Sequence, residues 1–338
     1  MTVNTFKAAV LGSGSTAEYH LRVLKKSKII EPTVIFGKHH SRVSYLSNQF
    51  DLIPAESLEH CLSLPHISFV DISTSNDLHF LYALAALRAN KSVILEKPAA
   101  FTFNEVETLV QEADSRNLLI LICLQKRYNS SFQQVRKLLS RENFGTFLFG
   151  ESKILMPRKP EYYDSKRKST LEFSGGGVLI YQAFHDLDLI CLLLGPAQTI
   201  KGSIKLNYHT MEVEDTASLI LEFESGGMLH FFASTDIRFP SLIETQLIFE
   251  SGRVAFNDTH FCWHKIREPK LRQPFFSSRS LPARIINRLM RKQRGHYGII
   301  VKEMEDFLMN QDEVSTCSLK TAKEAHRVIE TFYKQSRN

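Results

Sequence analysis

Five short apolar runs alternate with helical segments along the first 125 residues, and this alternation limits what the chain can fold into. Mainly apolar runs are typical of strands buried on both faces of a parallel sheet. A helix between successive strands is the connection that parallel strands need. We therefore predict an α/β domain with a doubly wound parallel sheet. The predicted strands are Phe6–Leu11, Thr33–Phe36, Ile67–Ile72, Val93–Leu95 and Leu118–Leu124.

A glycine-containing turn follows the first strand directly and precedes a helix. A strand, a G-x-G-x-x-G/A turn and a helix in this order favour dinucleotide binding. Gly12 allows a tight turn, Gly14 lets the backbone approach a pyrophosphate, and Ala17 allows close packing of helix on strand. Amides at the helix start attract the phosphates, although a glycine turn that binds nothing is the alternative. The predicted phosphate turn comprises Gly12, Ser13, Gly14, Ser15, Thr16 and Ala17.

The second strand ends in cations instead of the acid that holds the ribose hydroxyls in NAD sites. Gly37 is followed by Lys38 and His39, and no acid occurs before Asp51. A small residue followed by a cation suits the 2′-phosphate of NADP. We therefore predict NADP(H) in preference to NAD(H), with Lys38 and His39 beside the 2′-phosphate. In the alternative, Lys38 lines a solvated turn and NAD(H) is bound.

A lysine stands where the fourth predicted strand ends, in the stretch Val93–Pro98. Ligands bind at the carboxyl edge of an open parallel sheet, so Lys97 is well placed for chemistry. Pro98 favours an extended backbone at Lys97 and ends the strand. A surface lysine in a strand-to-helix turn is the alternative. The next helix is predicted to begin at Thr102, which with Glu105 has the pattern of a capping box.

The pattern changes after Tyr128, where helices become fewer and strands follow one another. Gly175–Gly177 precedes a predicted amphipathic helix over Val178–Leu194. Strands separated by hairpin turns are predicted within Ile200–His264. We therefore predict a second domain of the α+β class with a mostly antiparallel sheet.

The length of 338 residues is consistent with two domains. We predict a dinucleotide-binding domain over 1–125 and a substrate-binding and dimerisation domain over 126–338. Two C-terminal helices, Ile299–Met309 and Leu319–Gln335, are expected in the second domain.

Cysteine usage and the apolar runs indicate a cytoplasmic protein. No apolar run is long enough for a membrane span, and the first residues lack the pattern of a secretory signal. The five cysteines are widely spaced without a Cys-x-x-Cys pair, so free thiols and no metal site are expected. These residues are Cys61, Cys123, Cys191, Cys262 and Cys317.

A basic insertion is expected at about 265–295, where ten Lys or Arg residues accompany a single acid, Glu268. Three interpretations remain open. The insertion is a solvated segment, or it attracts a phosphorylated substrate such as a nucleotide sugar, or 275–294 makes weak contact with an anionic membrane. Nucleic acid is not an expected partner, because no recognition motif accompanies the charge.

Five motifs occur in a characteristic order: GSGSTAEYH, STSNDLH, LEKP, QKRYN and SGGGVLIYQAFHDLD. In this combination the chain resembles the glucose–fructose oxidoreductase, inositol dehydrogenase and MocA (Gfo/Idh/MocA) family of NAD(P)-dependent oxidoreductases, over nearly its whole length. The resemblance implies an N-terminal Rossmann domain followed by a domain with an open-faced antiparallel sheet. It also implies a homodimer or homotetramer.

The resemblance implies roles for individual residues. Lys97 matches the family's catalytic lysine, with Glu96 beside it near the nicotinamide. His185 matches the catalytic histidine, and Asp188 matches a structural acid. The turn beside the two riboses matches Ser73, Thr74, Ser75, Asn76 and His79, and the crossover near cofactor and substrate matches Arg127 and Tyr128.

Three positions depart from the family pattern. Ser75 replaces a usual proline and Ala183 a frequent glycine. Tyr181 stands four residues before His185, where many members carry an aspartate that binds the substrate or assists the histidine. On one continuous helix, Tyr181 and His185 would share a face, and the phenol could bond a sugar hydroxyl or relay a proton.

These residues lead to a hypothesis about function. Lys97 and His185 would be the acid–base pair on a secondary hydroxyl or ketone of a sugar, nucleotide sugar or cyclitol, while the nicotinamide carries the hydride. Tyr128 and Tyr181 would also contact the substrate. The alternative is a non-catalytic, cofactor- or sugar-sensing regulatory protein of the same fold.

Overall fold

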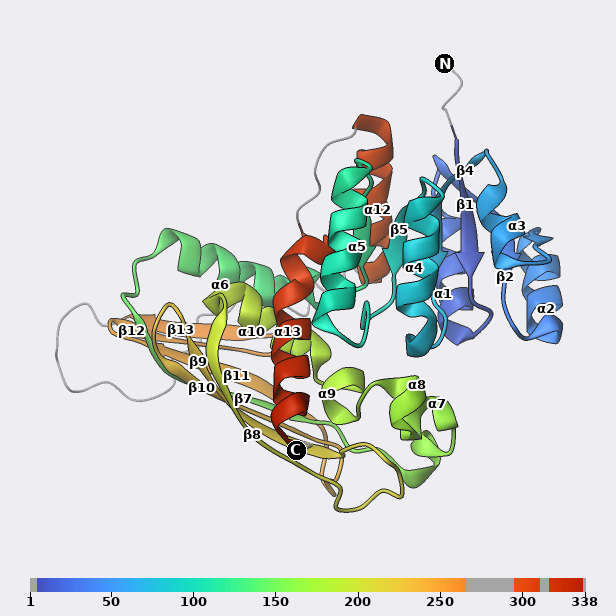
Figure 1. Cartoon of the computed structure of the whole chain (residues 1–338). Helices are drawn as coiled ribbons and strands as arrows, with labels where there is room; N and C mark the ends of the chain where they lie inside the picture. The colour runs from blue at the N-terminus through green and yellow to red at the C-terminus, as the bar shows by residue number, and fades with distance from the viewer. Residues whose placement is uncertain (1–4, 266–294, 311–315, 337–338) are drawn as a thin grey trace. The chain divides into compact units, whose positions relative to one another are not determined.

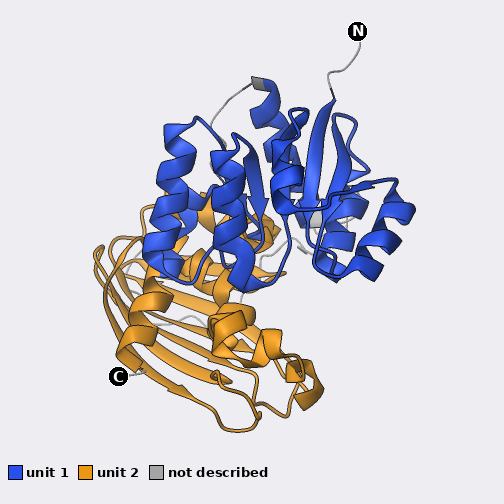
Figure 2. Ribbon diagram, turned by 45° about the vertical axis from the view of Figure 1, so that its right-hand side comes forward, with its two compact units in different colours: residues 1–124, 294–326 blue, residues 125–293, 327–338 orange. Residues whose placement is uncertain are grey.

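The computed structural model describes residues 5–265, 295–310 and 316–336. The chain divides into two compact units (Figure 2). The first unit comprises 1–124 with 294–326, and the second comprises 125–293 with 327–338. The first boundary lies within one residue of the predicted one, whereas the return of 294–326 to the first unit differs from the prediction.

A six-stranded parallel sheet forms the centre of the first unit, with the strand order β3-β2-β1-β4-β5-β6. The order reverses at β1, as in a doubly wound sheet. The predicted Rossmann architecture is thereby confirmed, with the short strand β3 as an addition. The strands are β1 (Phe6–Leu11), β2 (Ile30–Phe36), β3 (Ile53–Pro54), β4 (Ile67–Ile72), β5 (Ser92–Leu95) and β6 (Ile120–Ile122).

Helices connect these strands. Helix α4 packs beside α5 (Figure 1), and α1 contacts α12. The capping box before α5 is confirmed, because the Thr102 hydroxyl accepts from the Glu105 amide while the Glu105 carboxylate accepts from the Thr102 amide. The helical elements are α1 (Ser15–Leu24), α2 (His40–Phe50), α3 (Leu58–Ser63), η1 (Asn76–Leu78), α4 (His79–Arg88), α5 (Phe103–Ser115), α12 (Gly295–Asn310) and the start of α13 (Leu319–Ser336).

The assignment of α12 to the second domain was wrong. Tyr297 and Met304 are fully buried, and the Tyr297 hydroxyl donates to Asp71 in β4 of the parallel sheet. The Ile122 amide at the end of β6 donates to the Cys317 carbonyl at 2.8 Å. The apolar face of a helix shows that the helix is packed, but it does not show against which sheet. The prediction assigned α12 to the second domain because of its place in the sequence, and that assignment failed for this reason.

The second unit contains a seven-stranded sheet in the order β13-β12-β11-β7-β10-β9-β8. Only the β7–β10 pair is parallel, so the predicted mostly antiparallel sheet is confirmed. The strands are β7 (Phe147–Leu155), β8 (Ala197–Lys205), β9 (Thr216–Phe223), β10 (Met228–Ser234), β11 (Leu242–Phe249), β12 (Gly252–Phe256) and β13 (Phe261–Lys265).

The helix predicted over Val178–Leu194 is broken in the structure. The amides of Gln182 and Ala183 both bond to the Val178 carbonyl at 3.0 Å, so the regular hydrogen-bond ladder stops there. A new helix then begins from the Ala183 carbonyl. The helical elements of this unit are η2 (Gln125–Tyr128), α6 (Ser130–Arg141), η3 (Pro160–Tyr163), α7 (Lys166–Ser169), α8 (Leu171–Ser174), α9 (Val178–Tyr181), α10 (Phe184–Leu194) and the end of α13.

Within the described residues, no single helix is long and apolar enough to cross a membrane. The segments Leu171–Tyr181 and Phe184–Leu194, bent by 59° at the break, meet the length and composition test only as a pair.

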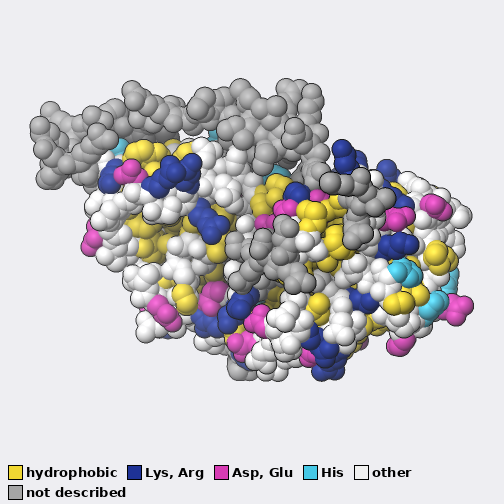
Figure 3. All heavy atoms as spheres, turned by 90° about the horizontal axis from the view of Figure 1, so that it is seen from above, with side chains coloured by type: hydrophobic (Ala, Val, Ile, Leu, Met, Phe, Trp, Pro, Cys, Tyr) yellow, Lys and Arg dark blue, Asp and Glu magenta, His cyan; other side chains and the backbone are white. Residues whose placement is uncertain are grey.

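Charged side chains of both signs are interspersed on the face that Figure 3 shows. The basic insertion predicted at about 265–295 falls almost entirely on 266–294, outside the described residues. Its three interpretations therefore stay predictions. The five cysteines all lie in the described residues, and none of them forms a disulfide bond there.

Candidate functional site

Three loops leave the parallel sheet side by side at its carboxyl edge. The Gly12 amide donates to the Phe36 carbonyl at 2.8 Å, which ties the ends of β1 and β2 together. The Ser73 amide donates to the Leu11 carbonyl at 2.9 Å, and the Glu96 amide donates to Ile72 at 2.9 Å. The phosphate turn, the Ser73–Asn76 turn and the Glu96–Lys97 turn are therefore adjacent. This edge is where an open α/β sheet binds its ligand.

The phosphate turn has the backbone that a dinucleotide requires. Gly12 has φ +132°, and a Cβ there would lie 2.5 Å from the Ser73 carbonyl oxygen. Gly14 is exposed, and no described heavy atom lies within 4 Å of where its Cβ would be. Exposed Ser15 and Thr16 begin α1, while Ala17 is fully buried. The helix start is thus open to an anion while its base packs on the sheet.

Two buried polar atoms beside this turn fit a bound cofactor. The Ser73 hydroxyl and His79 Nε2 are buried without a hydrogen-bond partner among the described residues. His79 Nδ1 is 2.6 Å from the Pro98 carbonyl, and burial lowers the pKa of His79, so Nδ1–H donates and neutral Nε2 can accept. Buried polar atoms normally find partners, so these two suit a ligand with hydroxyl or amide groups. Thr74, Ser75 and Asn76 complete the turn into η1.

Lys97 follows β5 and is half-buried, as is Glu96. The Glu96 carboxylate accepts from the Lys97 amide at 3.1 Å. Beyond the following proline, the Ala99 amide donates to His326 Nε2 at 3.0 Å in α13. The turn that carries the predicted catalytic lysine is therefore fixed on both sides.

Arg42 is a candidate cofactor residue that the sequence reasoning missed. Lys38 and His39 are exposed after β2, and their contact with a 2′-phosphate stays a prediction. Arg42, in the first turn of α2, donates from Nε to the Ser13 carbonyl at 3.2 Å and pairs with Glu18 at 2.9 Å. Its guanidinium thus joins the strand-end cations to the phosphate turn. The available signal was a further cation a few residues beyond Lys38.

In the second unit, Tyr181 and His185 lie on separate helices. Tyr181 ends α9 and donates its hydroxyl to the Arg167 carbonyl at 2.5 Å, whereas half-buried His185 lies in the first turn of α10. The expectation that both share one helical face was therefore wrong, because the helix breaks at Gln182–Ala183. Lys97 and His185 belong to different units, and their pairing stays a prediction.

The glycine run before α9 is packed around Glu214, which the sequence reasoning did not single out. The buried Glu214 carboxylate accepts from the Gly177 amide at 3.0 Å, the Leu179 amide at 3.3 Å and the Tyr333 hydroxyl at 2.6 Å. A Cβ on Gly177 would lie 1.8 Å from the Glu214 carbonyl oxygen. The turn that leads to Tyr181 and His185 is thus held by a residue from just before β9.

Two ion pairs join η2 to α10. Arg127, fully buried, donates to Asp188 from Nε at 2.7 Å and from a terminal nitrogen at 2.6 Å. Lys126 lies 2.9 Å from Asp186, whose pKa burial raises to about 6 against the opposing effect of Lys126. Both acids follow His185 closely near the start of α10. The guanidinium of Arg127 therefore positions α10, while its predicted cofactor contact stays a prediction, as does that of buried Tyr128 with substrate.

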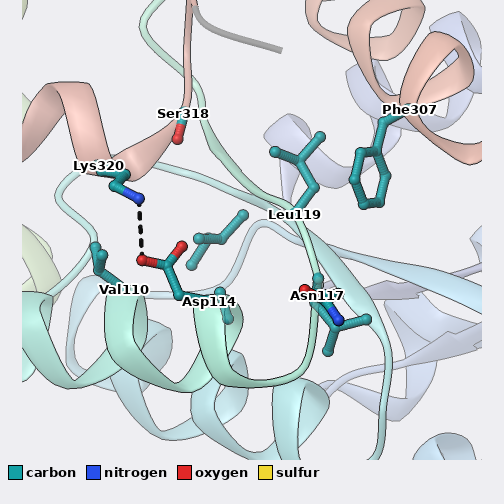
Figure 4. A pocket seen from close by; sticks show the side chains of 10 residues that line it. Val110, Asp114, Asn117, Leu119, Phe307, Ser318 and Lys320 are labelled. Carbon is teal, nitrogen blue, oxygen red and sulfur yellow. Dashed lines mark hydrogen bonds and ion pairs between the residues drawn. The ribbon is translucent and has the colours of Figure 1, made fainter. Parts of the chain in front are cut away.

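A separate pocket of about 270 Å³ lies in the first unit where the chain enters β6 (Figure 4). Its wall includes Val110, Leu119 and Phe307, and an ion pair of 3.1 Å joins Lys320 to Asp114 at its rim. The amino end of β6 is the edge of the sheet opposite the phosphate turn. The pocket is therefore distinct from the candidate site.

Comparisons with known proteins identify the family of this chain. The family model of the oxidoreductase family with the NAD-binding Rossmann fold (Gfo/Idh/MocA) matches residues 6–123, and the model of the Gfo/Idh/MocA C-terminal domain matches residues 132–255. The chain belongs to the Gfo/Idh/MocA family of oxidoreductases.

Two curated relatives and one solved structure illustrate the range of the family. The chain is 26% identical over 226 residues to scyllo-inositol 2-dehydrogenase (NADP(+)) IolW of Bacillus subtilis, covering 65% of this chain and only 61% of that relative. It is 24% identical to UDP-N-acetylglucosamine 3-dehydrogenase of Acidithiobacillus ferrooxidans, covering 77% of each. The WlbA dehydrogenase from Bordetella pertussis, in complex with NADH and UDP-GlcNAcA, has a TM-score of 0.85 at 19% identity, covering 99% of this chain and 97% of that one. The last likeness establishes the fold.

Proposed function

We propose that this protein is an oxidoreductase that transfers a hydride between NADP(H) and a secondary hydroxyl or ketone of a sugar, nucleotide sugar or cyclitol. The main supporting observation is that Lys97 and the open phosphate turn lie at the same carboxyl edge of one sheet, separated by the Ser73–Asn76 turn. Two relatives are named as dehydrogenases of scyllo-inositol and of UDP-N-acetylglucosamine, which supports this substrate class. They also favour an enzyme over a regulatory protein.

The residues at the sheet edge can hold a nicotinamide dinucleotide. The amides at Gly14–Thr16 would bind the pyrophosphate, and the Ser73 hydroxyl and His79 Nε2 would bond ribose or carboxamide groups. Lys38, His39 and Arg42 would bind the 2′-phosphate, which is the basis for preferring NADP(H) to NAD(H). When bound, the nicotinamide accepts or donates the hydride.

Lys97 and His185 would move the proton that accompanies the hydride. In oxidation of a secondary alcohol, the hydroxyl loses its proton to Lys97 Nζ while hydride leaves the same carbon, and the product is a ketone. Lys97 must be neutral to accept that proton. His185 would act with Lys97 as the second group that accepts or donates this proton. Tyr128 and Tyr181 would bind substrate hydroxyls.

The substitution Lys97→Met tests the assignment most directly. We expect turnover to fall at least roughly a hundredfold, since general acid–base catalysis is worth about 10²–10⁴. NADPH binding, followed by the fluorescence of the reduced cofactor, should stay within about threefold of wild type. Lys320→Met is the matched control, because it removes a lysine from the opposite edge of the sheet and should leave turnover unchanged. Retained turnover in Lys97→Met would refute the catalytic role.

A substrate panel completes the test. Sugars, cyclitols and nucleotide sugars are each assayed with NADP and with NAD. Turnover on one class with NADP favoured supports the proposal. Tight NADPH binding without turnover on any member would instead support the regulatory alternative.

A further inference from the structure

A buried polar cluster lies directly beneath the Glu96–Lys97 turn and plays no part in the mechanism above. His20 comes from α1, Asp71 from the second-last position of β4 and Tyr297 from α12, and each is at most 1% exposed. The cluster belongs wholly to the first unit. We define it as the His20 cluster.

The geometry within the His20 cluster fits a positively charged His20 ring. His20 Nδ1 lies 2.9 Å and 3.1 Å from the two oxygens of Asp71. The Tyr297 hydroxyl donates to the same carboxylate, and its ring stacks on the imidazole with the centroids 3.7 Å apart and the planes 5° from parallel. A carboxylate inside a parallel sheet is costly unless a cation compensates it. His20 is the cation that meets Asp71.

The other nitrogen of His20 points toward the catalytic turn. His20 Nε2 lies 3.4 Å from Glu96, and the other Glu96 oxygen accepts from the Lys97 amide at 3.1 Å. Hydrogen bonds therefore join Tyr297 and His20 to Asp71, and Glu96 to the Lys97 backbone, while an ion-pair contact of 3.4 Å without a regular hydrogen bond links His20 to Glu96.

We propose that His20, held between Asp71 and Tyr297, is a positioning residue that fixes Glu96 and, through it, the geometry and charge environment of Lys97. The proposal rests on the proposed function in so far as Lys97 is the acid–base group. It assigns to α1 a second task besides presenting its start to the phosphates.

The charged groups around His20 determine how its replacement changes the electrostatic environment of Lys97. Burial opposes its charged form, but Asp71 and Glu96 outweigh burial and raise the pKa of His20 to about 9. Burial also raises the pKa of the nearby phenols and thiol, so these groups are neutral at physiological pH. The groups facing His20 in the described residues are Asp71, Glu96, Cys123, Tyr19 and Tyr297.

Loss of the His20 cation therefore leaves excess negative charge beside Lys97. Negative neighbours favour the protonated form of a lysine and raise its pKa. In oxidation, where Lys97 must be neutral to accept a proton, the rate rises with pH through that pKa. We expect His20→Gln to shift the half-maximal pH of kcat upward by roughly half a unit or more and to lower kcat several-fold at neutral pH. NADPH affinity should change less than kcat.

Tyr297→Phe is the matched control. It disturbs the same core and removes a donor to Asp71, but it keeps the stacked ring and the imidazolium. Its half-maximal pH should stay at the wild-type value even if its turnover falls. An unshifted profile in His20→Gln, or an equal shift in Tyr297→Phe, would overturn the proposal.

Two measurements do not depend on turnover. Because the pKa of His20 is raised in the folded state from 6.5 to about 9, its stabilising effect is full below pH 6.5 and is lost as pH rises toward 9. The stability advantage of wild type over His20→Gln should shrink over that range, even if no substrate is found and the proposed function fails. Should the variant not fold, histidine NMR of the wild-type protein must show one imidazolium that persists to about pH 9.

Metal analysis closes the test. The nearest donor atoms of His20, Glu96 and Cys123 lie within 4.8 Å of one another. Purified protein without stoichiometric zinc supports a hydrogen-bonded ion cluster. Stoichiometric zinc would overturn the proposal, because the metal rather than a proton would then hold these side chains.

Discussion

The two glycine turns of this protein, one in each unit, need glycine for opposite reasons. At Gly14 the space beside the backbone is open, with no described atom within 4 Å of a Cβ position. At Gly177 the same space is filled by the backbone of Glu214, 1.8 Å from where a Cβ would be. The first glycine leaves room for a ligand, and the second leaves room for the protein itself. A glycine in a motif therefore identifies a close approach without identifying what approaches.

Gly177→Ala should have the largest effect in this comparison. The new methyl group would collide with backbone that three hydrogen bonds to Glu214 hold in place, so we expect a loss of roughly 3 kcal/mol or more in the free energy of unfolding. Denaturant titration of the second unit measures it. Gly195→Ala is the control: its φ of +85° and ψ of −159° bring backbone strain of about 1–3 kcal/mol, but its Cβ meets open space. Equal losses in the two variants would contradict a packing role for Gly177.

Gly14→Ala should have the opposite effect to Gly177→Ala. It should leave the folding stability nearly unchanged and weaken cofactor binding. Its φ of −79° is accessible to alanine, so the free energy of unfolding should change by less than about 1 kcal/mol. A methyl group in the path of the pyrophosphate should weaken NADPH binding at least roughly tenfold, or 1.4 kcal/mol. Fluorescence titration gives the affinity and thermal unfolding the stability. Unchanged NADPH affinity would mean that the turn does not face the phosphates.

Tyr333→Phe should have the smallest effect and a pH dependence. Burial raises the pKa of Glu214, and the Tyr333 hydroxyl opposes that rise. Removing the hydroxyl raises this pKa further and costs about 1 kcal/mol at neutral pH. A raised carboxyl pKa means that stability is lost as pH increases above the ordinary value of 4.5. The deficit of the variant relative to wild type should therefore grow between pH 4.5 and 7, and a deficit independent of pH would argue against a charged Glu214.

Features that depend on local chemistry were predictable from the sequence. The phosphate turn, the capping box at Thr102 and the position of Lys97 at a strand end each need only neighbouring residues. The alternation of strands and helices likewise gave the doubly wound sheet without further information. Most of the first unit follows from such short-range patterns.

Features that depend on distant partners were not predictable. Nothing near Gly177 in sequence indicates that Glu214, 37 residues later, fills its turn. The break at Gln182–Ala183 lies inside an apolar stretch whose sequence is equally compatible with one continuous helix. Asp71 is an acid in a buried strand whose compensating cation, His20, lies 51 residues away. The sequence shows such a charge, but only the folded chain shows what neutralises it.

The position of β7 has a consequence for how quickly the second unit folds. β8, β9 and β10 form one antiparallel meander, β11, β12 and β13 form another, and β7 is the central strand between them. Each meander can form through short loops. In contrast, Gly150 of β7 pairs with Leu229 of β10 and with Leu247 of β11, which are both distant in sequence. Such long-range pairings carry a high loop-closure entropy and slow the search for the native state. The two meanders should therefore gain protection from hydrogen exchange early in refolding, with β7 completing the sheet last.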